Sequence, residues 1–197
     1  MGLTGDARLG PDTGRPLFQR VGETEIYRGH VLRLVSADFV GPQGEQFRRD
    51  VVRSPGAVAV VPILNRPEGP STVLVRQFRP AIEAWLLEIP AGLRDKHDEA
   101  PEATAYRELI EETGYAAQRL DLLTVMLNAA GMTDQRTHIY LARDLAEVGR
   151  AGEGVEEAYL EVHQVPLAGI RPLIESGELC DAKTIVGLLL ALAQLGL

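Results

Sequence analysis

The feature that most constrains the fold is an uninterrupted apolar run, AVAVVPIL, between Ala57 and Leu64. A strand that faces water on one side alternates apolar and polar residues, whereas a continuous apolar run is typical of a strand covered on both faces. The chain must therefore supply a packing layer on each side of the sheet that holds this strand. Its 197 residues, of which 45% are hydrophobic, are enough to bury such a core.

The segments around this run predict the rest of the sheet and its covering layers. Before it, ETEIYRG, VLRLVSADFV and EQFRRDVVR are β-rich, and the GPQG between the last two indicates a hairpin turn. After it, strands are expected at TVLVRQFR, WLLEIPAG, LDLLTVML, THIYLARDL and EAYLEVHQV. Helices are expected before Gly114 and near 167–176 and 182–196. This order indicates an α/β fold, with a mixed sheet covered by helices.

Local signals mark the ends of two of these helices. Pro101 suits the first turn of the first helix, and Gly114 is expected to end it. Asp98 or Glu99 is expected to cap its start, and Asp181 to cap the start of the C-terminal helix.

Charge and composition exclude several classes of protein. A net charge of −8 argues against a general nucleic-acid binder, which needs a basic face. The apolar stretch 184–197 is too short to cross a bilayer. Residues 1–16 lack the apolar segment of a signal peptide and are expected to form a mobile tail. A single cysteine rules out an internal disulfide framework. We therefore expect a cytoplasmic protein with no nucleic-acid or membrane partner.

The segment RELIEETG, which ends at Gly114, poses a physical problem. On a helix its glutamates, Glu108, Glu111 and Glu112, lie within about 100° of one another, and like charges at such spacings cost about 0.2–0.5 kcal/mol per pair. Two of them also lie in the last turn, where the helix dipole favours cations. A solvated acidic surface is the plain alternative. A divalent cation would offset both penalties, so the segment predicts half of a metal site.

The neighbouring residues indicate which chemistry such a metal would serve. The PAG turn before the helix offers backbone carbonyl oxygen, and Arg107 is spaced to pair with Glu111 and orient it. A magnesium ion held by one or two carboxylates usually binds a substrate phosphate as well. Hydrolysis of a phosphate ester or of a pyrophosphate is therefore the reaction indicated.

The stretch GLRDKHDEAPEATAYRELIEETGY, residues 92–115, resembles the signature of the Nudix hydrolases. Every fixed position of its second half is present, from Arg107 to Gly114. The loop between Gly92 and Glu99 holds six residues, one more than the family pattern, and we take Glu99 as the glutamate that braces this loop.

This resemblance implies a fold, a cofactor and a set of metal ligands. The expected fold is the Nudix α/β/α sandwich around a mixed sheet, with an N-terminal antiparallel β region. The expected ligands are Glu108, Glu112 and the backbone carbonyl of Ala91, with Glu111 in a supporting catalytic role. The expected cofactor is Mg²⁺, with Mn²⁺ as the alternative.

Further segments resemble one branch of that family, the ADP-ribose pyrophosphatases. They include VRQFRPAIEAWLLEIPAGL before the signature and GELCDAKTIVGLLLAL near the C-terminus. The resemblance implies a homodimer in which N-terminal strands, within 17–55, cross to the other subunit and help to form an adenosine pocket. Residues 56–197 would form the Nudix hydrolase domain.

Five residues are expected to bind substrate. Arg79 follows an apolar strand and could hold a diphosphate with its two-pronged guanidinium, and Arg53 is a second candidate. Glu88 is a carboxylate within an apolar strand and needs a partner if buried, for which a ribose hydroxyl or the metal shell would serve. Met132 and Asp134 are expected to face the terminal ribose.

The catalytic base is expected in the loop GRAGEGVEEAYL, which precedes a late strand. Its candidates are Glu153, Glu156 and Glu157. By position in the related pattern we favour Glu157, then Glu156. The glycines of this loop suit a segment that brings a carboxylate to a metal-bound water.

The reaction implied is hydrolysis of ADP-ribose, or of a related nucleoside diphosphate sugar, to AMP and a sugar phosphate. One departure concerns the substrate, because Ala130 stands where ADP-ribose pyrophosphatases commonly carry proline. The alternatives are a Nudix activity on GDP-mannose or a dinucleoside polyphosphate, or a non-catalytic module that senses a nucleotide.

Overall fold

The computed structural model describes residues 17–96, 98–150 and 158–197. The chain divides into two compact units, Met1–Arg53 and Ser54–Leu197. The predicted tail, residues 1–16, lies outside the described part of the chain.

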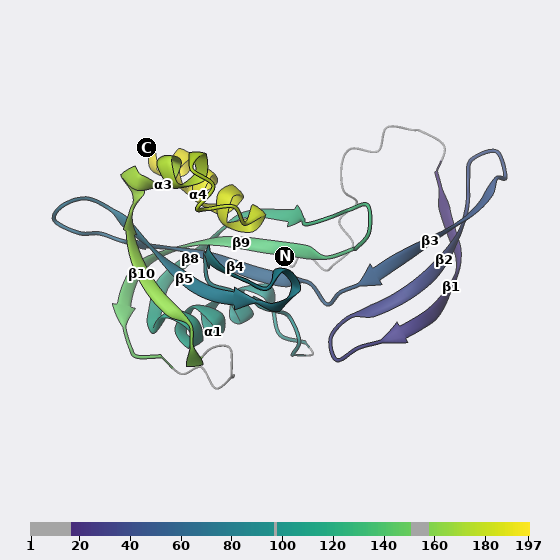
Figure 1. The fold of residues 1–197 in the computed structure, drawn as a ribbon, viewed down its shortest axis with the longest axis horizontal. Helices are drawn as coiled ribbons and strands as arrows, with labels where there is room; N and C mark the ends of the chain where they lie inside the picture. The colour runs from purple at the N-terminus through teal and green to yellow at the C-terminus, as the bar shows by residue number, and fades with distance from the viewer. Residues whose placement is uncertain (1–16, 97, 151–157) are drawn as a thin grey trace. The chain divides into compact units, whose positions relative to one another are not determined.

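The first unit is a three-stranded antiparallel sheet in the order β1-β2-β3 (Figure 1). Its strands are β1 (Gln19–Arg28), β2 (Arg33–Val40) and β3 (Gln46–Arg53). The predicted hairpin is confirmed, because β2 and β3 pair antiparallel on either side of the GPQG turn. Phe39 lies directly opposite Phe47, and their rings stack with centroids 5.3 Å apart.

The second unit contains a seven-stranded mixed sheet, as predicted. Its main order is β10-β5-β4-β9-β8, with β6 paired to β5 and β7 paired to β4. The β4–β9 pair is parallel, and the other pairs are antiparallel. The strands are β4 (Ala57–Leu64), β5 (Ser71–Arg79), β6 (Ala84–Glu88), β7 (Ala91–Leu93), β8 (Tyr115–Leu127), β9 (Arg136–Glu147) and β10 (Glu161–Pro166), with the short 3-10 helix η1 (Pro80–Ile82) before β6.

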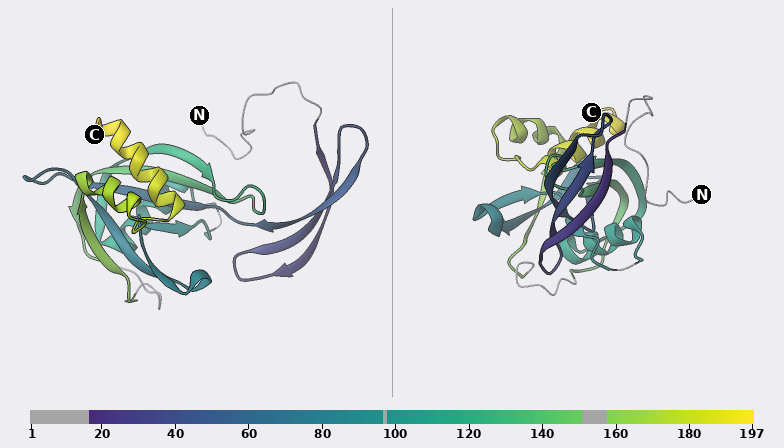
Figure 2. Two further views of the ribbon diagram at one scale, coloured as in Figure 1. Left: turned by 45° about the horizontal axis from the view of Figure 1, so that its top comes forward. Right: turned by 90° about the vertical axis from the view of Figure 1, so that its right-hand side faces the viewer.

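Helices cover both faces of this sheet (Figures 1 and 2). One face carries α1 (Pro101–Thr113) and the other carries α3 (Ile170–Glu175), preceded by η2 (Leu167–Gly169), and α4 (Ala182–Leu195). No helix within the described residues combines the length and the apolar character that a membrane span requires.

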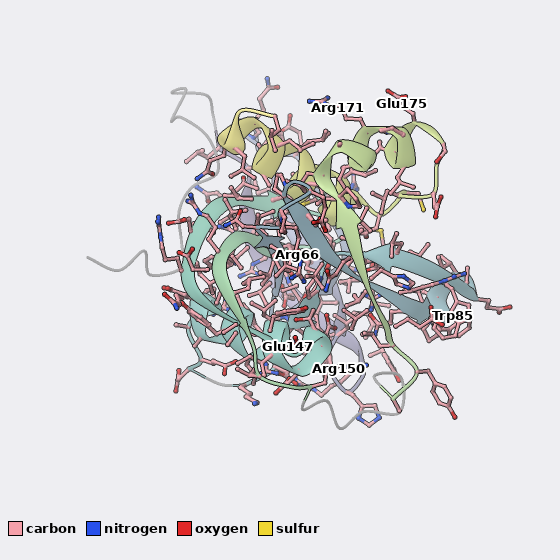
Figure 3. All side chains as sticks on the ribbon, turned by 90° about the vertical axis from the view of Figure 1, so that its left-hand side faces the viewer. Arg66, Trp85, Glu147, Arg150, Arg171 and Glu175 are labelled. Carbon is pink, nitrogen blue, oxygen red and sulfur yellow. The ribbon has the colours of Figure 1, made fainter. Side chains whose placement is uncertain are left out.

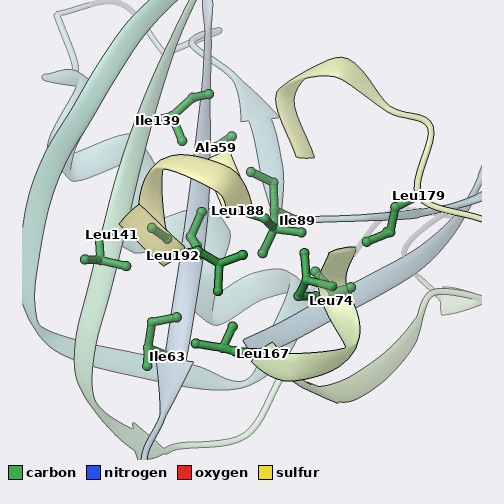
Figure 4. Close-up of a cluster of buried hydrophobic side chains, with 13 residues drawn as sticks. Ala59, Ile63, Leu74, Ile89, Ile139, Leu141, Leu167, Leu179, Leu188 and Leu192 are labelled. Carbon is green, nitrogen blue, oxygen red and sulfur yellow. The ribbon is translucent and has the colours of Figure 1, made fainter. Parts of the chain in front are cut away.

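The apolar run that began the sequence analysis is the central strand β4, and it is buried on both faces as predicted. Val58 and Val60 pack with Ala105 and Leu109 of α1. The alternate side chains, including Val61, join the larger cluster beneath α4, which is drawn in Figure 4. Because successive side chains point to opposite faces of a strand, β4 contributes residues to two separate hydrophobic cores.

The predicted helix ends are correct at three of four places. Pro101 begins α1, Gly114 ends it at a positive φ of 76°, and the Asp181 carboxylate accepts a hydrogen bond from the Thr184 N–H at 2.9 Å at the start of α4. The predicted cap of α1 is wrong. Neither Asp98 nor Glu99 caps the helix, because Ala100 occupies the N-cap position without a side-chain hydrogen bond.

Candidate active site

The acidic side of α1 lines a cavity of about 500 Å³ in the second unit. Glu108 and Glu112 are one helical turn apart and only 8% and 5% exposed. Together with Glu111, which lines the same cavity, they form what we call the acidic wall. Burial excludes the plain alternative of a solvated acidic surface for Glu108 and Glu112.

Glu112 is held against strand β7. The Ala91 N–H donates a hydrogen bond to its Oε2 at 2.9 Å. Burial of the carboxyl, together with the nearby charge of Glu108, raises the pKa of Glu112 to about 8, although the Ala91 hydrogen bond acts in the opposite direction. Without a cation, Glu112 therefore binds a proton at neutral pH.

Strand geometry directs the Ala91 carbonyl oxygen to the same side as its N–H group. Ala91 lies opposite Ala59 in the antiparallel β4–β7 pair, and its N–H points to Glu112 rather than to β4. The N–H and C=O of one strand residue point to the same side. We infer that the Ala91 carbonyl also faces the acidic wall.

The glycine that opens the signature has a steric role. Gly92 follows Ala91 in β7, and a Cβ at this position would overlap the carboxylate of Glu108. The close approach of strand and helix therefore requires a residue without a side chain.

Arg107 and Glu99 brace the acidic wall from the side. Arg107 donates to Glu111 at 2.7 Å and to Glu99 at 3.4 Å, and lies 2.7 Å from Glu108. Burial alone would lower the pKa of Arg107, but the surrounding carboxylates outweigh it and raise that pKa. Glu99 also accepts a hydrogen bond from the Thr104 hydroxyl at 2.9 Å. The predicted Arg107–Glu111 pair and the bracing contacts of Glu99 are therefore present.

The acidic wall fits a hard divalent cation. Within the described ranges, no three His, Cys, Asp or Glu side chains form a group that could hold a metal ion. Magnesium in phosphate-transfer sites is nevertheless often held by one or two carboxylates, with water and substrate oxygens completing its shell. Two buried carboxylates that repel each other, beside an inward-facing backbone carbonyl, supply that donor set.

Besides Arg107, two further cations line the same cavity, Arg79 at the end of β5 and Lys183 in the first turn of α4, and we call these two the basic wall. Both donate to Glu88, which is 1% exposed. Arg79 does so through two bonds of 2.8 and 2.7 Å. Burial would raise the pKa of Glu88, but Arg79 and Lys183 outweigh it and hold the pKa at about 2. The buried Glu88 carboxylate is paired, as its position in an apolar strand required, but its partners are these two cations; contact with a ribose hydroxyl or with the metal shell stays a prediction.

Lys183 is fixed from its other side by the helix cap. Its ammonium group donates to the Asp181 carboxylate at 3.0 Å, and the Thr184 hydroxyl accepts the Ile89 N–H at 3.0 Å. Sequence reasoning did not assign Lys183 a role. Its position two residues after the cap Asp181 was the available signal.

Polar residues that the sequence analysis also missed line the remainder of the cavity. Thr137 donates to Asn128 at 2.8 Å, and Asn128 donates to Gln135 at 3.2 Å. Gln77, from β5, and Asp95 also line the cavity.

Other predicted substrate residues have different surroundings. Met132 is 59% exposed, and Asp134 accepts a hydrogen bond from the Ser54 N–H at 3.0 Å; neither is among the described residues that line the cavity. Arg53 ends the first unit and donates to Glu23 at 2.5 Å.

The predicted base candidates, Glu153, Glu156 and Glu157, lie outside the described residues. On either side of that segment, Arg150 donates to the Leu160 carbonyl at 2.9 Å. Figure 3 labels Arg150 and also Glu147, the last residue of β9.

Comparison with known proteins agrees with this geometry. The chain matches the NUDIX domain model over residues 53–176. It is 39% identical to an ADP-ribose pyrophosphatase of Bacillus subtilis over 164 residues, covering 83% of this chain and 86% of the relative. It is 33% identical to a methanol dehydrogenase activator of Bacillus methanolicus over 174 residues, covering 88% and 92%.

Two further matches are a GDP-mannose pyrophosphatase and a solved structure. A GDP-mannose pyrophosphatase of Cronobacter sakazakii is 35% identical over 164 residues, which cover 79% of this chain and 84% of the relative. In three dimensions, a crystal structure of an ADP compounds hydrolase superposes with a TM-score of 0.77 at 24% identity, covering 91% of this chain and 94% of that one. The buried carboxylate pair, the glycine packed against it and these similarities lead to one conclusion: the chain belongs to the Nudix hydrolase family.

Proposed function

We propose that this Nudix hydrolase cleaves the diphosphate of ADP-ribose, or of a related nucleoside diphosphate sugar, with Mg²⁺ as cofactor. Mn²⁺ is the alternative metal. The observation that supports this most is that the acidic wall and the basic wall line one cavity. A diphosphate carries two linked negative groups, which suits a site with a cation-binding side and a cationic side.

Each wall has a distinct role in this proposal. Arg79 and Lys183 bind non-bridging phosphoryl oxygens and oppose the charge that grows on them as the bond breaks. Glu88 keeps both cations in place. Glu108, Glu112 and the Ala91 carbonyl would hold the metal, which supplies charge stabilisation and makes a bound water more acidic.

The proton balance requires a base. Water adds to one phosphorus, the bond from that phosphorus to the bridging oxygen breaks, and ADP-ribose yields AMP and ribose 5-phosphate. Glu157, or else Glu156, accepts the proton of the attacking water. Glu111, held by Arg107, supports the metal ligands.

The relatives favour ADP-ribose but leave a defined rival. An ADP-ribose pyrophosphatase supports the first assignment, whereas a GDP-mannose pyrophosphatase of similar identity, together with Ala130, supports another nucleotide sugar. Dinucleoside polyphosphates are the other alternative substrate for a Nudix hydrolase that does not act on ADP-ribose. The relative named as an activator supports a third possibility, a nucleotide-sensing module that acts on a partner protein.

We also propose that the chain forms a homodimer through its N-terminal strands. In support, β1 exposes large apolar side chains, among them Val21 at 61%, Ile26 at 55% and Tyr27 at 66%. Exposed large apolar side chains gathered on one strand are typical of an interaction surface. Arg53, Met132 and Asp134 remain proposed substrate contacts within that assembly.

The test is a substrate panel. The protein is incubated with ADP-ribose, GDP-mannose and a dinucleoside polyphosphate in the presence of Mg²⁺ or Mn²⁺, and the nucleotide products are separated by chromatography. We expect AMP from ADP-ribose at the highest kcat/KM. Preferred turnover of GDP-mannose would favour the rival, and tight ADP-ribose binding by calorimetry without hydrolysis would favour the sensing module.

A further inference from the structure

Gln77 is a polar residue of the cavity whose hydrogen-bonding capacity is unused within the described chain. It is 7% exposed and lines the cavity. Its side chain forms no hydrogen bond with any residue that the structure describes, whereas nearby Arg79, Lys183 and Asn128 are all bonded. Neither amide atom of Gln77 is a fully buried atom without a partner, so the amide is open to the cavity, where a bound ligand can reach it.

The strand register places Gln77 within the basic wall. Gln77 and Arg79 are two residues apart on β5 and so share one face of the sheet. Val75 lies directly opposite Glu88, and Gln77 opposite Leu86. Because the guanidinium of Arg79 reaches back along the strand to Glu88, it passes the level of Gln77.

The charges around Gln77 indicate what the amide binds. Arg79 and Lys183 line the same cavity as Glu108 and Glu112. A ligand that contacts both walls is expected to place its negatively charged groups next to the two cations. The NH₂ of Gln77 is then the neutral donor beside two charged ones, and it can reach an oxygen between them.

We propose that Gln77 is a substrate-contacting residue that donates a hydrogen bond to a non-bridging oxygen of the diphosphate. This inference rests on the proposed function, because it takes the diphosphate as the group that spans the two walls. The bond forms when substrate enters, and it takes the place of the solvent that the amide meets in the free protein.

The test separates this role from a structural one by measuring stability and activity together. Gln77→Met keeps the length of the side chain and removes its hydrogen-bonding groups. Because the amide has no partner within the described chain, we expect an unchanged or higher Tm. We expect kcat/KM for ADP-ribose to fall roughly 10- to 100-fold, the effect of losing a hydrogen bond to a charged group.

Gln164→Met is the matched control. Gln164 accepts a hydrogen bond from Arg66 at 2.9 Å and donates to Tyr115 at 3.0 Å, and it does not line the cavity. This variant should show the opposite pattern, a lower Tm and unchanged turnover. If Gln77→Met instead lowers Tm while kcat/KM stays at the wild-type value, Gln77 is structural and the inference is overturned.

A binding measurement distinguishes this inference from the proposed function. Methylenediphosphonate, a diphosphate that cannot be hydrolysed at its bridge, is titrated into wild type and Gln77→Met by calorimetry with MgCl₂ present. We expect a loss of affinity matching the loss in kcat/KM. Equal affinity for both proteins overturns the role of Gln77. Wild-type binding without hydrolysis of any nucleotide in the panel overturns the proposed function alone.

Discussion

Gly92 and Glu108 approach so closely that a Cβ on residue 92 would lie 2.1 Å from the carboxylate carbon of Glu108. Gly92 belongs to β7, whose backbone is paired with Val58 of the buried strand β4. The strand is therefore fixed by its ladder, and the glutamate side chain is the part that must move if a side chain is added.

Gly92→Ala should displace Glu108 and impair the acidic wall. We expect kcat/KM to fall about 100-fold, the effect of misplacing a reacting group by roughly 1 Å, and overpacking to cost about 1–3 kcal/mol of stability. Steady-state kinetics and thermal melting check both. Gly131→Ala is the control, because its Cβ would meet nothing within 4 Å. Full activity in Gly92→Ala would mean that the position of Glu108 is not critical.

Glu112 should make the metal-free protein less stable as pH rises. Its pKa is about 8 in the folded chain and 4.5 as the reference value, so the folded state binds the proton more tightly. That contribution is fully present below pH 4.5 and is lost as pH rises towards about 8. Melting in EDTA across this range measures the loss. Added Mg²⁺ should restore stability at the upper end, because it replaces the proton.

Glu112→Gln should remove this dependence. The neutral amide keeps an oxygen for the Ala91 N–H and no longer repels Glu108, so we expect a higher Tm than wild type in EDTA at pH 8. Hydrolysis and the Mg²⁺-induced rise in Tm should both be lost. Glu102→Gln, an exposed change in the first turn of α1, is the control. A normal metal response in Glu112→Gln would reject the proposed metal site.

Glu88 should dominate stability in acid, with the opposite sign. Its folded pKa of about 2 lies below the reference value of 4.5, so its contribution is present above pH 4.5 and is lost as pH falls towards 2. The difference corresponds to about 3 kcal/mol. Urea unfolding at pH 5 and pH 3 should show a loss of roughly 2 kcal/mol in wild type, because Glu88 is still mostly ionised in the folded state at pH 3. Glu88→Gln should be less stable at pH 5 and should lose much less on acidification.

Lys183 should contribute to activity through its charge. Lys183→Met removes one cation from the basic wall, and we expect kcat/KM to fall about 10- to 100-fold. Stability should fall by about 1–3 kcal/mol because buried Glu88 keeps Arg79 but loses a donor. Lys96→Met removes the other lysine of the chain and should have little effect. Equal kinetics for both variants would argue against a phosphate-binding role.

Features set by neighbouring residues could be predicted from the sequence. Pro101 and Gly114 mark the bounds of α1 through backbone geometry alone, and helical periodicity places Glu108 and Glu112 on one face. The apolar run of β4 similarly required two covering layers. Each of these arguments uses residues within a few positions of one another.

The basic wall could not be predicted in the same way. Glu88 and Lys183 are separated by 95 positions, and their contact depends on how α4 packs onto the sheet. The prediction for the cap of α1 was wrong for a different, local reason. The carboxylate of Glu99, a suitable cap in sequence, is bonded to Thr104 and Arg107 instead.

The attachment of α4 to the end of β6 has a consequence for how the cavity responds to local unfolding. Lys183 lines the cavity from the first turn of α4 and donates to Glu88, and the Thr184 hydroxyl accepts the Ile89 N–H. Local unfolding of this helix would therefore withdraw a cation from the cavity and remove one donor from the buried Glu88 carboxylate. Fraying of α4 and loss of the cavity's charge pattern are thus expected to occur together.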